Sequence, residues 1–291
     1  MYELEMTKDV VSIEYFENPE RFADLLNTYV YEGKQIVRGE DVKELNRSFS
    51  RVVKGKKNVK TQVVTADVVK EVNGGMRPNG EMKATVVSLE NQALVHYAMP
   101  IRVMNLEACG YHEQWRQKDN ENRKAGRNKM TESEFLSGVT SKQRFTPMIT
   151  LVLYFGKEPW NGPKCLWELL DLEGYSEQEK KLVADYPINV IDVRRYENSD
   201  LFRTDLKLIF GVLKRENSKK ELAEFLQENQ KEFEAIKTDA YNMISVMVGC
   251  DELLEAEEKN RTGGENNMCK AIYDMVEDGR LGGRQEGKQK M

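Results

Sequence analysis

Two carboxylates in separate extended segments are the residues with the clearest potential for chemistry. Asp67 lies in the run VVTADVV, and Glu90 lies two positions before Gln92 in the run KATVVSLENQ. Because side chains alternate along a strand, Glu90 and Gln92 share one face of their strand. In the earlier run the apolar residues on either side of Asp67 share one face, which leaves Asp67 on the more polar face. If the two segments are neighbouring strands, the two carboxylates converge.

Two carboxylates held that close repel each other, and one would take up a proton unless a cation lies between them. Mg²⁺ is usually held by one or two carboxylates plus waters and phosphate oxygens, and it both activates a water and neutralises charge on the phosphate. Gln92 could orient the water or a phosphate through its amide, although it lacks the charge of a lysine. These residue types favour hydrolysis of a phosphodiester, with Asp67 and Glu90 as ligands of Mg²⁺ or another divalent cation. The plainer interpretation is a pair of solvent-facing carboxylates on half-exposed strands.

The composition excludes several other kinds of site. Two histidines and four widely spaced cysteines argue against a zinc site, a disulfide framework and a Ser-His-Asp triad. The 291 residues carry 44 basic and 49 acidic groups, a net charge of −5, so any contact with DNA must use local basic patches. No run approaches the ~18 apolar residues of a membrane span, and the N-terminus is charged where a signal peptide is apolar. We therefore expect a cytoplasmic protein without membrane contact.

Strands are predicted at four places that could position the carboxylates: residues 63–69, 83–92, 147–155 and 187–193. The run from Pro147 is apolar without alternation, which is typical of a strand covered on both faces, so it should be central. The Gly-rich stretch 73–80 reads as the connection between the first two strands.

Helices are predicted on both sides of these strands. Asn18 as N-cap and Pro19 at the first position predict a helix over about 18–31. A second helix opens at Pro100 and gives way to a polar loop over 116–129. From Leu201 onward the periodicity is helical throughout. The expected fold is α/β, a mixed sheet flanked by helices, with residues 1–215 as the main domain and 216–291 as a helical region with a charged tail.

Several motifs resemble one known family. The stretch LENQALVHYAMPIRVM, the upstream TADVV, the later block ITLVLYFGKEPWNGPKCLWELLDL and the tail MCKAIYDMVEDGRLGGRQEG are similar to the recombination-promoting nucleases, also called YhgA-like putative transposases. That family is placed in the PD-(D/E)XK nuclease superfamily, so the resemblance, which runs from about Lys8 to the C-terminus, implies a restriction-endonuclease-like sheet.

The resemblance also implies roles for single residues. Asp67 matches the metal-binding aspartate, Glu90 the second acidic residue, and Gln92 the position where the wider superfamily has lysine. Arg102 matches the arginine of the M-P-x-R motif, where it would contact a phosphate or support Glu90; an exposed arginine covering apolar surface is the alternative. The superfamily often adds a glutamate from the first helix.

For that extra glutamate both Glu14 and Glu20 are available. Members commonly have arginine just before the aspartate, whereas this chain has Thr65 and Ala66 there.

The basic runs 51–60 and 116–129 are the best candidates for contact with the DNA backbone, since phosphate contacts need only local charge. In the first run the residues expected to make them are Lys54, Lys56, Lys57 and Lys60. Solvated loops would explain both runs as well. Met268, Ile272 and Met275 at heptad-like spacing allow a homodimer.

The hypothesis that unites these features is a Mg²⁺-dependent DNA endonuclease of recombination or mobile elements. One alternative is a catalytically silent member of the same fold that binds DNA or a partner protein. Another is an interaction protein whose C-terminal helices dominate its function.

Overall fold

The computed structural model describes residues 2–54, 59–76, 82–126 and 129–250, together with Leu253 and the short stretches 261–262 and 265–268. The chain divides into two compact units. The helical unit comprises residues 1–39, 155–157 and 192–291, and the sheet unit comprises residues 40–154 and 158–191. The expected domain boundary at residue 215 stays a prediction, because it concerns which parts of the chain can fold independently.

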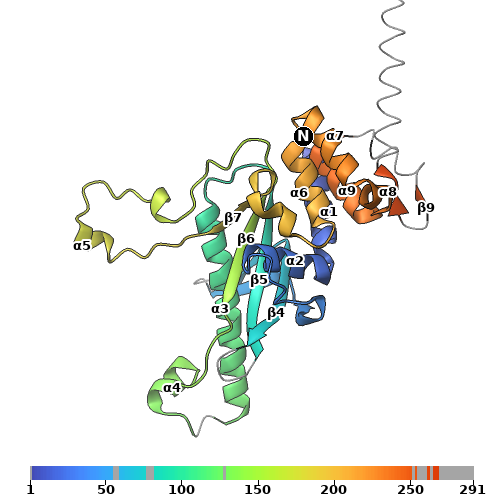
Figure 1. The fold of residues 1–291 in the computed structure, drawn as a ribbon. Helices are drawn as coiled ribbons and strands as arrows, with labels where there is room; N and C mark the ends of the chain where they lie inside the picture. Colours follow the sequence, from blue (N-terminus) through green and yellow to red (C-terminus); the bar gives the residue numbers. More distant parts are fainter. Residues whose placement is uncertain are drawn as a thin grey trace, which may run out of the picture. The chain divides into compact units, whose positions relative to one another are not determined.

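Within the described residues, the sheet unit is built on a five-stranded mixed sheet in the order β1-β4-β5-β6-β7 (Figure 1). Its strands are β1 (Val42–Glu44), β4 (Val68–Met76), β5 (Met82–Gln92), β6 (Met148–Tyr154) and β7 (Asn189–Asp192). β1, β4 and β5 pair antiparallel, whereas β5 and β6 are parallel. This mixed sheet flanked by helices confirms the expected α/β class and is consistent with a restriction-endonuclease-like fold.

β6 lies inside the sheet, between β5 and β7. Six of its seven residues are buried, without the alternation of a half-exposed strand. The uniform burial confirms that its apolar run marks a strand covered on both faces. β5 is the middle strand, so the strand that carries Glu90 has a hydrogen-bonded neighbour on each side.

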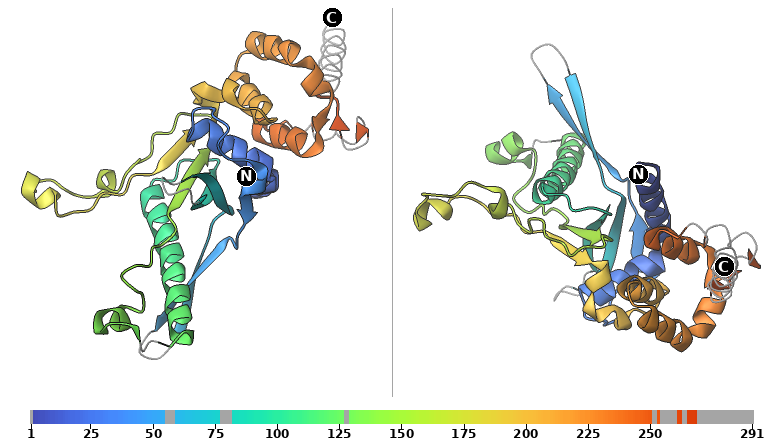
Figure 2. Two further views of the ribbon diagram at one scale, coloured as in Figure 1. Left: turned by 60° about the horizontal axis from the view of Figure 1, so that its bottom comes forward. Right: turned by 90° about the horizontal axis from the view of Figure 1, so that it is seen from above.

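The single strand predicted over 63–69 is wrong, because the chain changes partners at Ala66 and Asp67. β3 (Val59–Thr65) pairs with β2 (Ser48–Lys54) in a separate two-stranded ribbon, which Figure 2 shows in light blue. β4 then begins at Val68 in the main sheet. At the break the Ala66 backbone N–H donates to Arg47 O over 3.0 Å, so the apolar run hides a crossover between two sheets.

The long helix α3 (Met99–Lys124) covers one face of the sheet. Its first half has Pro100 in the first turn and buries Met99 and Val103 against Val152 of β6. Farther along, Leu106 and Cys109 pack with Phe49, Val69 and Val86 in a second apolar cluster.

The second half of α3 corrects the prediction of a polar loop over 116–129, since the helix continues to Lys124. Its polar side chains bind the segment that follows. Asn122 Nδ2 donates to Gly138 O over 2.9 Å, and the Trp115 indole N–H donates to Ser137 O over 2.8 Å. The segment contains the short helix α4 (Glu132–Ser137), which begins with a capping box between Thr131 and Glu134.

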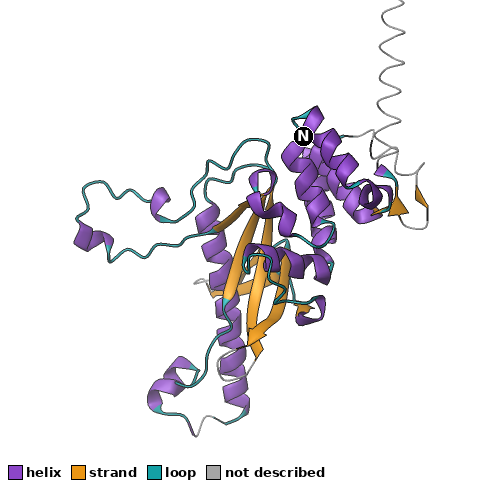
Figure 3. Cartoon of the chain, viewed as in Figure 1, coloured by secondary structure: helices purple, strands orange, loops and turns teal. Residues whose placement is uncertain are grey.

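A long connection of mostly irregular chain joins β6 to β7, drawn in teal in Figure 3. Within the sheet unit it contains the short turns η3 (Trp167–Leu169) and α5 (Glu177–Lys180). Trp167 anchors it by donating its indole N–H to Val183 O over 3.1 Å.

The helical unit gathers helices from both ends of the chain. Its helices are α1 (Tyr2–Glu17), α2 (Pro19–Tyr29), α6 (Leu206–Arg215), α7 (Lys219–Glu228), α8 (Gln230–Glu234) and α9 (Thr238–Val248), with turns η1 (Gly39–Asp41, at its border), η4 (Val193–Arg195) and η5 (Glu197–Leu201) and short strands β8 (Ile236–Lys237), β9 (Arg261–Thr262) and β10 (Glu265–Asn266). The helix predicted over 18–31 is confirmed as α2, and Asn18 caps it by accepting from the Glu20 backbone N–H over 2.9 Å.

A buried arginine joins four of these helical segments. Arg21 of α2 is 1% exposed, and its guanidinium donates to Asp205 before α6 and to Asp239 of α9, with Nη2 to Asp205 Oδ2 at 2.6 Å and Nη1 to Asp239 Oδ2 at 2.5 Å. Tyr15 of α1 lies against the guanidinium, 4.0 Å from Arg21 Cζ to the ring centre, and donates its hydroxyl to Asp205 over 2.6 Å. The start of the chain is thus fixed to its later helices.

Candidate active site

Glu90 lies in β5, and Asp67 lies in the break just before β4, the antiparallel neighbour of β5. Val68 of β4 pairs with Leu89 of β5, so Asp67 and Glu90 are the next positions along the two strands. Residues opposite each other in an antiparallel pair project from the same face of the sheet. By the same alternation Gln92 shares that face, which is the one covered by α3.

Asp67 is fixed at the point where the ladder between β4 and β5 ends. Its Oδ2 accepts the backbone N–H of Asn91 over 2.6 Å, so the carboxylate takes the place of a strand partner. Burial raises the pKa of Asp67, although the Asn91 N–H and the charges of Arg102 and Arg47 act to lower it. A net upward shift means that the ionised carboxylate is less favourable here than in water, and a further cation would stabilise it.

Glu90 is 1% exposed and is held by Arg102 from the first turn of α3. Arg102 Nε and Nη2 both donate to Glu90 Oε2, over 2.8 and 2.6 Å. Charge-assisted hydrogen bonds of this length are among the stronger polar contacts in proteins. The charge of Arg102 also acts to lower the pKa of Asp67, so one guanidinium affects both carboxylates.

Gln92 lies at the end of β5, beside Tyr154 of β6, and is half-buried. Its Nε2 donates to Asn91 O over 2.9 Å. Both polar backbone atoms of Asn91 therefore have side-chain partners: its N–H donates to Asp67, and its carbonyl accepts from Gln92. Gln92 supplies a neutral amide where the superfamily pattern has a charged amine.

The donor set suits a hard divalent cation. Asp67 and Glu90 offer carboxylate oxygens, and one or two carboxylates completed by water and phosphate oxygens are a usual Mg²⁺ site. Among the described residues, no group of three or more His, Cys, Asp or Glu side chains could hold a metal. Glu14 and Glu20 belong to the helical unit, and a contribution from either stays a prediction.

A buried carboxylate farther along α3 was not anticipated from the sequence. Glu107 accepts the Thr150 hydroxyl at Oε1 over 2.7 Å and the Tyr186 hydroxyl at Oε2, and Thr150 in turn contacts Ser88 Oγ at 2.9 Å. Burial and the bond to Glu107 raise the pKa of Tyr186. The signal was available, since Glu107 follows Val103 and Leu106 on the apolar side of the helix.

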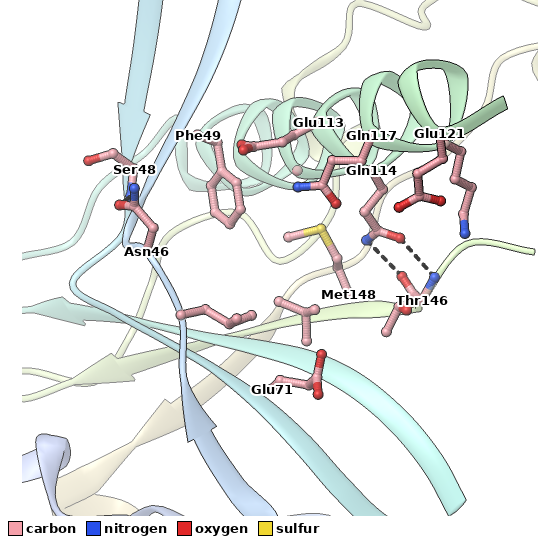
Figure 4. A pocket seen from close by; sticks show the side chains of 14 residues that line it. Asn46, Ser48, Phe49, Glu71, Glu113, Gln114, Gln117, Glu121, Thr146 and Met148 are labelled. Atoms are coloured by element: carbon pink, nitrogen blue, oxygen red, sulfur yellow. Dashed lines mark hydrogen bonds between the residues drawn. The ribbon is translucent and has the colours of Figure 1, made fainter. Parts of the chain in front are cut away.

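A cavity of about 280 Å³ lies at the other end of the same sheet face (Figure 4). Figure 4 shows Glu113, Gln117 and Glu121 of α3 facing Met148 and Glu71. Gln114 closes one side by exchanging two hydrogen bonds with the Thr146 backbone, of 3.1 and 2.8 Å. Asp67 and Glu90 are not among its lining residues, so the carboxylate pair and the cavity are separate features.

The lysines expected to contact the DNA backbone are only partly described. Lys56 and Lys57 lie outside the described residues, and Lys54 and Lys60 are described in their backbone only, near the end of the ribbon formed by β2 and β3. In the second basic run, Arg123 pairs with Asp119 at 2.9 Å. Contact with DNA through these runs stays a prediction, as does a homodimer through Met268, Ile272 and Met275, of which the last two lie outside the described residues.

Comparison with known proteins gives one match. Residues 133–243 match the family described as "Putative transposase, YhgA-like", a range that begins in α4 and ends in α9. No curated protein and no solved structure matches the chain. None of the described helices is long and apolar enough to cross a membrane. Over residues 133–243, the chain is therefore similar to the YhgA-like putative transposase family.

Proposed function

We propose that this protein is a metal-dependent DNA endonuclease that acts in recombination or in the movement of genetic elements. The observation that carries the proposal is the placement of Asp67 just before β4, where it accepts the Asn91 N–H at the end of β5, next to Glu90 with its bonds from Arg102. The family match supports DNA as the substrate, because a transposase acts on DNA.

In this proposal Asp67 and Glu90 hold a Mg²⁺ ion together with water and phosphate oxygens. Such an ion lowers the pKa of a bound water and neutralises charge that develops on the phosphate. The chain itself contributes position. The Asn91 N–H fixes the Asp67 carboxylate, and the Gln92 amide donates to the Asn91 carbonyl, so these bonds would hold the end of β5 in place while a phosphate binds.

The experiment is a cleavage assay on supercoiled plasmid with the full chain. Mg²⁺ or Mn²⁺ should support nicking, a chelator should stop it, and Asp67→Asn and Glu90→Gln should each remove it while circular dichroism stays unchanged. Glu71→Gln is the matched control, because Glu71 projects from the same face of β4 but lies at the cavity. Full activity in either site variant, or equal loss in the control, would refute the mechanism.

A second candidate function is a DNA-binding protein that keeps the fold without the reaction. Two features favour a protein without catalysis. Gln92 stands where the superfamily has a lysine, and Arg102 is hydrogen-bonded to Glu90. This protein would bind duplex DNA with an affinity that falls steeply with salt and would not cleave with any divalent metal. Anisotropy of a labelled duplex, measured beside the plasmid assay, separates the two functions.

A further inference from the structure

We propose that Arg102 is a built-in competitor of the divalent cation, which occupies Glu90 in the metal-free protein and must leave it when a metal binds. The inference rests on the proposed metal site and adds a control of its affinity. Its basis is that one guanidinium places two N–H donors on a single oxygen of Glu90 and also acts on Asp67. Arg102 therefore already supplies the positive charge that the carboxylate pair requires.

The two partners differ in their freedom to move. The Glu90 side chain is 1% exposed and lies in the middle strand of the sheet, whereas the Arg102 side chain is 40% exposed. Arg102 also belongs to the first turn of α3, so its side chain can turn outward without disturbing the helix. Exchange of one cation for the other thus requires the half-exposed arginine side chain to turn away from Glu90.

Competition follows from charge and geometry. A divalent ion on Glu90 must take the oxygen that Arg102 now holds or lie beside a guanidinium of like charge, and both raise the free energy of the metal-bound state. Loss of the arginine should therefore strengthen metal binding. Couplings between two ligands of one protein typically change affinity by about 5- to 150-fold.

Arg102 released from Glu90 becomes available to a phosphate. Guanidinium groups bind phosphate with two parallel hydrogen bonds, and a half-exposed arginine beside the carboxylates is placed to do so. The same side chain would hold Glu90 in the resting protein and a DNA phosphate in the loaded one. Metal and DNA would then favour each other's binding through the position of one residue.

The test measures metal binding without any cleavage. Free Mn²⁺ is followed by its electron paramagnetic resonance signal during titration of the full chain without DNA. Arg102→Gln should bind Mn²⁺ about tenfold more tightly than the wild type, within the range typical of such couplings. Arg102→Lys, which keeps the charge but loses the forked contact, should lie between them.

Arg47→Gln is the matched control, because Arg47 also acts on the charge of Asp67 but contacts the Asp67 backbone oxygen rather than Glu90. It should change Mn²⁺ affinity less than Arg102→Gln does. Equal effects of the two variants, or unchanged Mn²⁺ binding in both Arg102 variants, would overturn the inference. Absence of cleavage by the wild type, together with tighter Mn²⁺ binding in Arg102→Gln, would reject the proposed nuclease but leave the competition standing.

A DNA-binding experiment in chelator tests the released arginine. Glu90→Gln removes the negative charge that holds Arg102, so that Arg102 is more readily released without metal, and the salt dependence of duplex binding should steepen by up to about one phosphate contact, a slope change of at most about 0.9. The double variant Glu90→Gln with Arg102→Gln should return to the wild-type slope. A slope gain that persists in the double variant would assign it to the lost negative charge and refute the phosphate contact.

Discussion

At the scale of single residues, the site combines two carboxylates that differ in burial and in support. Glu90 is buried and has an arginine on one oxygen, while Asp67 has a backbone N–H and a pKa raised by burial. An ionised carboxylate in that state opposes folding and favours binding of a cation. The features that suit Asp67 to hold a metal are the ones that reduce the stability of the metal-free protein.

Asp67→Asn should therefore raise the melting temperature of the protein in chelator at neutral pH, by about 2 °C. The amide oxygen can still accept the Asn91 N–H, while the unfavourable charge is removed. Calorimetric scans with and without Mn²⁺ measure it, and the Mn²⁺-induced shift should vanish in the variant. Asp67→Ala, which also loses the hydrogen bond, should melt lower than Asp67→Asn. A melting temperature of Asp67→Asn well below that of the wild type would contradict the inference that the ionised Asp67 carboxylate destabilises the folded protein.

At the scale of elements, α3 sets the position of Arg102, and the Glu107 network fixes α3 to the sheet. Glu107 accepts hydroxyl groups from β6 and from the segment before β7, so one side chain holds three parts of the sheet unit. Removal of the acceptor takes away both hydrogen bonds and leaves Thr150 with Ser88 only. Such bonds contribute about 0.5–1.5 kcal/mol each, and more where a charged group takes part.

Glu107→Ala should accordingly lower the free energy of unfolding by about 3 kcal/mol. Urea titration followed by tryptophan fluorescence measures it. Tyr186→Phe, which removes one of the two donors and leaves Thr150 bonded, should cost about 1 kcal/mol. A larger loss in Tyr186→Phe than in Glu107→Ala would contradict a network centred on the carboxylate.

Tyr186 also predicts a dependence on alkaline pH. Its pKa is raised in the folded protein, so the folded state holds the phenolic proton more tightly than the unfolded chain. The resulting stability is fully present below the ordinary tyrosine pKa of about 10 and is lost as pH rises above it. The wild type should lose stability between pH 9 and 11 more steeply than Tyr186→Phe, by urea titration at ~0.5 pH intervals. Parallel curves would refute this contribution.

The sequence anticipated part of these elements, and the failures have physical causes. Alternation along a strand placed Glu90 and Gln92 on one face, and the Gly-rich stretch between the two runs indicated a connection between two strands, which are β4 and β5. It missed the break at Asp67, since both sides of a crossover between two sheets are equally apolar. It also missed the end of α3, where the contacts that keep the helix intact come from residues 131–146.

The site itself was only half visible in the sequence. Residue types and strand alternation singled out Asp67 and Glu90 as a pair, and a shared metal ion remains a prediction. The contact between Arg102 and Glu90 depends on how α3 crosses the sheet, which no local pattern encodes. The family motif offered an arginine that contacts a phosphate or supports Glu90, and the three-dimensional arrangement shows it bonded to one oxygen of Glu90.

At the scale of the whole molecule, both units are built from segments far apart in the sequence. Arg21 illustrates this in the helical unit, where it is buried and bonded to Asp205 and Asp239. Removal of one partner from a buried ion pair leaves an uncompensated charge and commonly costs about 3–5 kcal/mol. This guanidinium therefore contributes strongly to the contacts of α2 with the later segments, beside Asp24, which accepts hydrogen bonds from Arg203 and Thr204.

Arg21→Met should lower the free energy of unfolding by about 3–5 kcal/mol, measured by denaturant titration followed by circular dichroism. Asp239→Asn, at the half-exposed end of the cluster, should cost less.

The stability that the Arg21–Asp239 pair gives the wild type should also fall in acid. Although burial acts to raise it, the bonds and charge of Arg21 keep the pKa of Asp239 below its ordinary value. The stability is present above about pH 4 and lost below it. An unchanged stability of Arg21→Met would refute this role.

Deletion of residues 216–291 is expected to unfold the helical unit, because it removes Asp239 and α9, against which α1 packs. Tyr15 and Phe16 of α1 are fully buried and would be exposed. Loss of helical circular dichroism beyond that of the deleted residues measures the effect. A truncated chain that keeps α1 and α2 protected from amide hydrogen exchange would instead support an independent domain ending near residue 215.

The Arg21 cluster also has a consequence for folding of the protein during its synthesis on the ribosome. Arg21 and Asp239 are 218 residues apart, so at about 5–20 residues per second the arginine waits roughly 10–45 s for its second carboxylate. The entire sheet unit is synthesised within that interval. Until then the apolar faces of α1 and α2 lack their packing partners and are prone to aggregation. We therefore expect a chaperone that acts during translation to bind them.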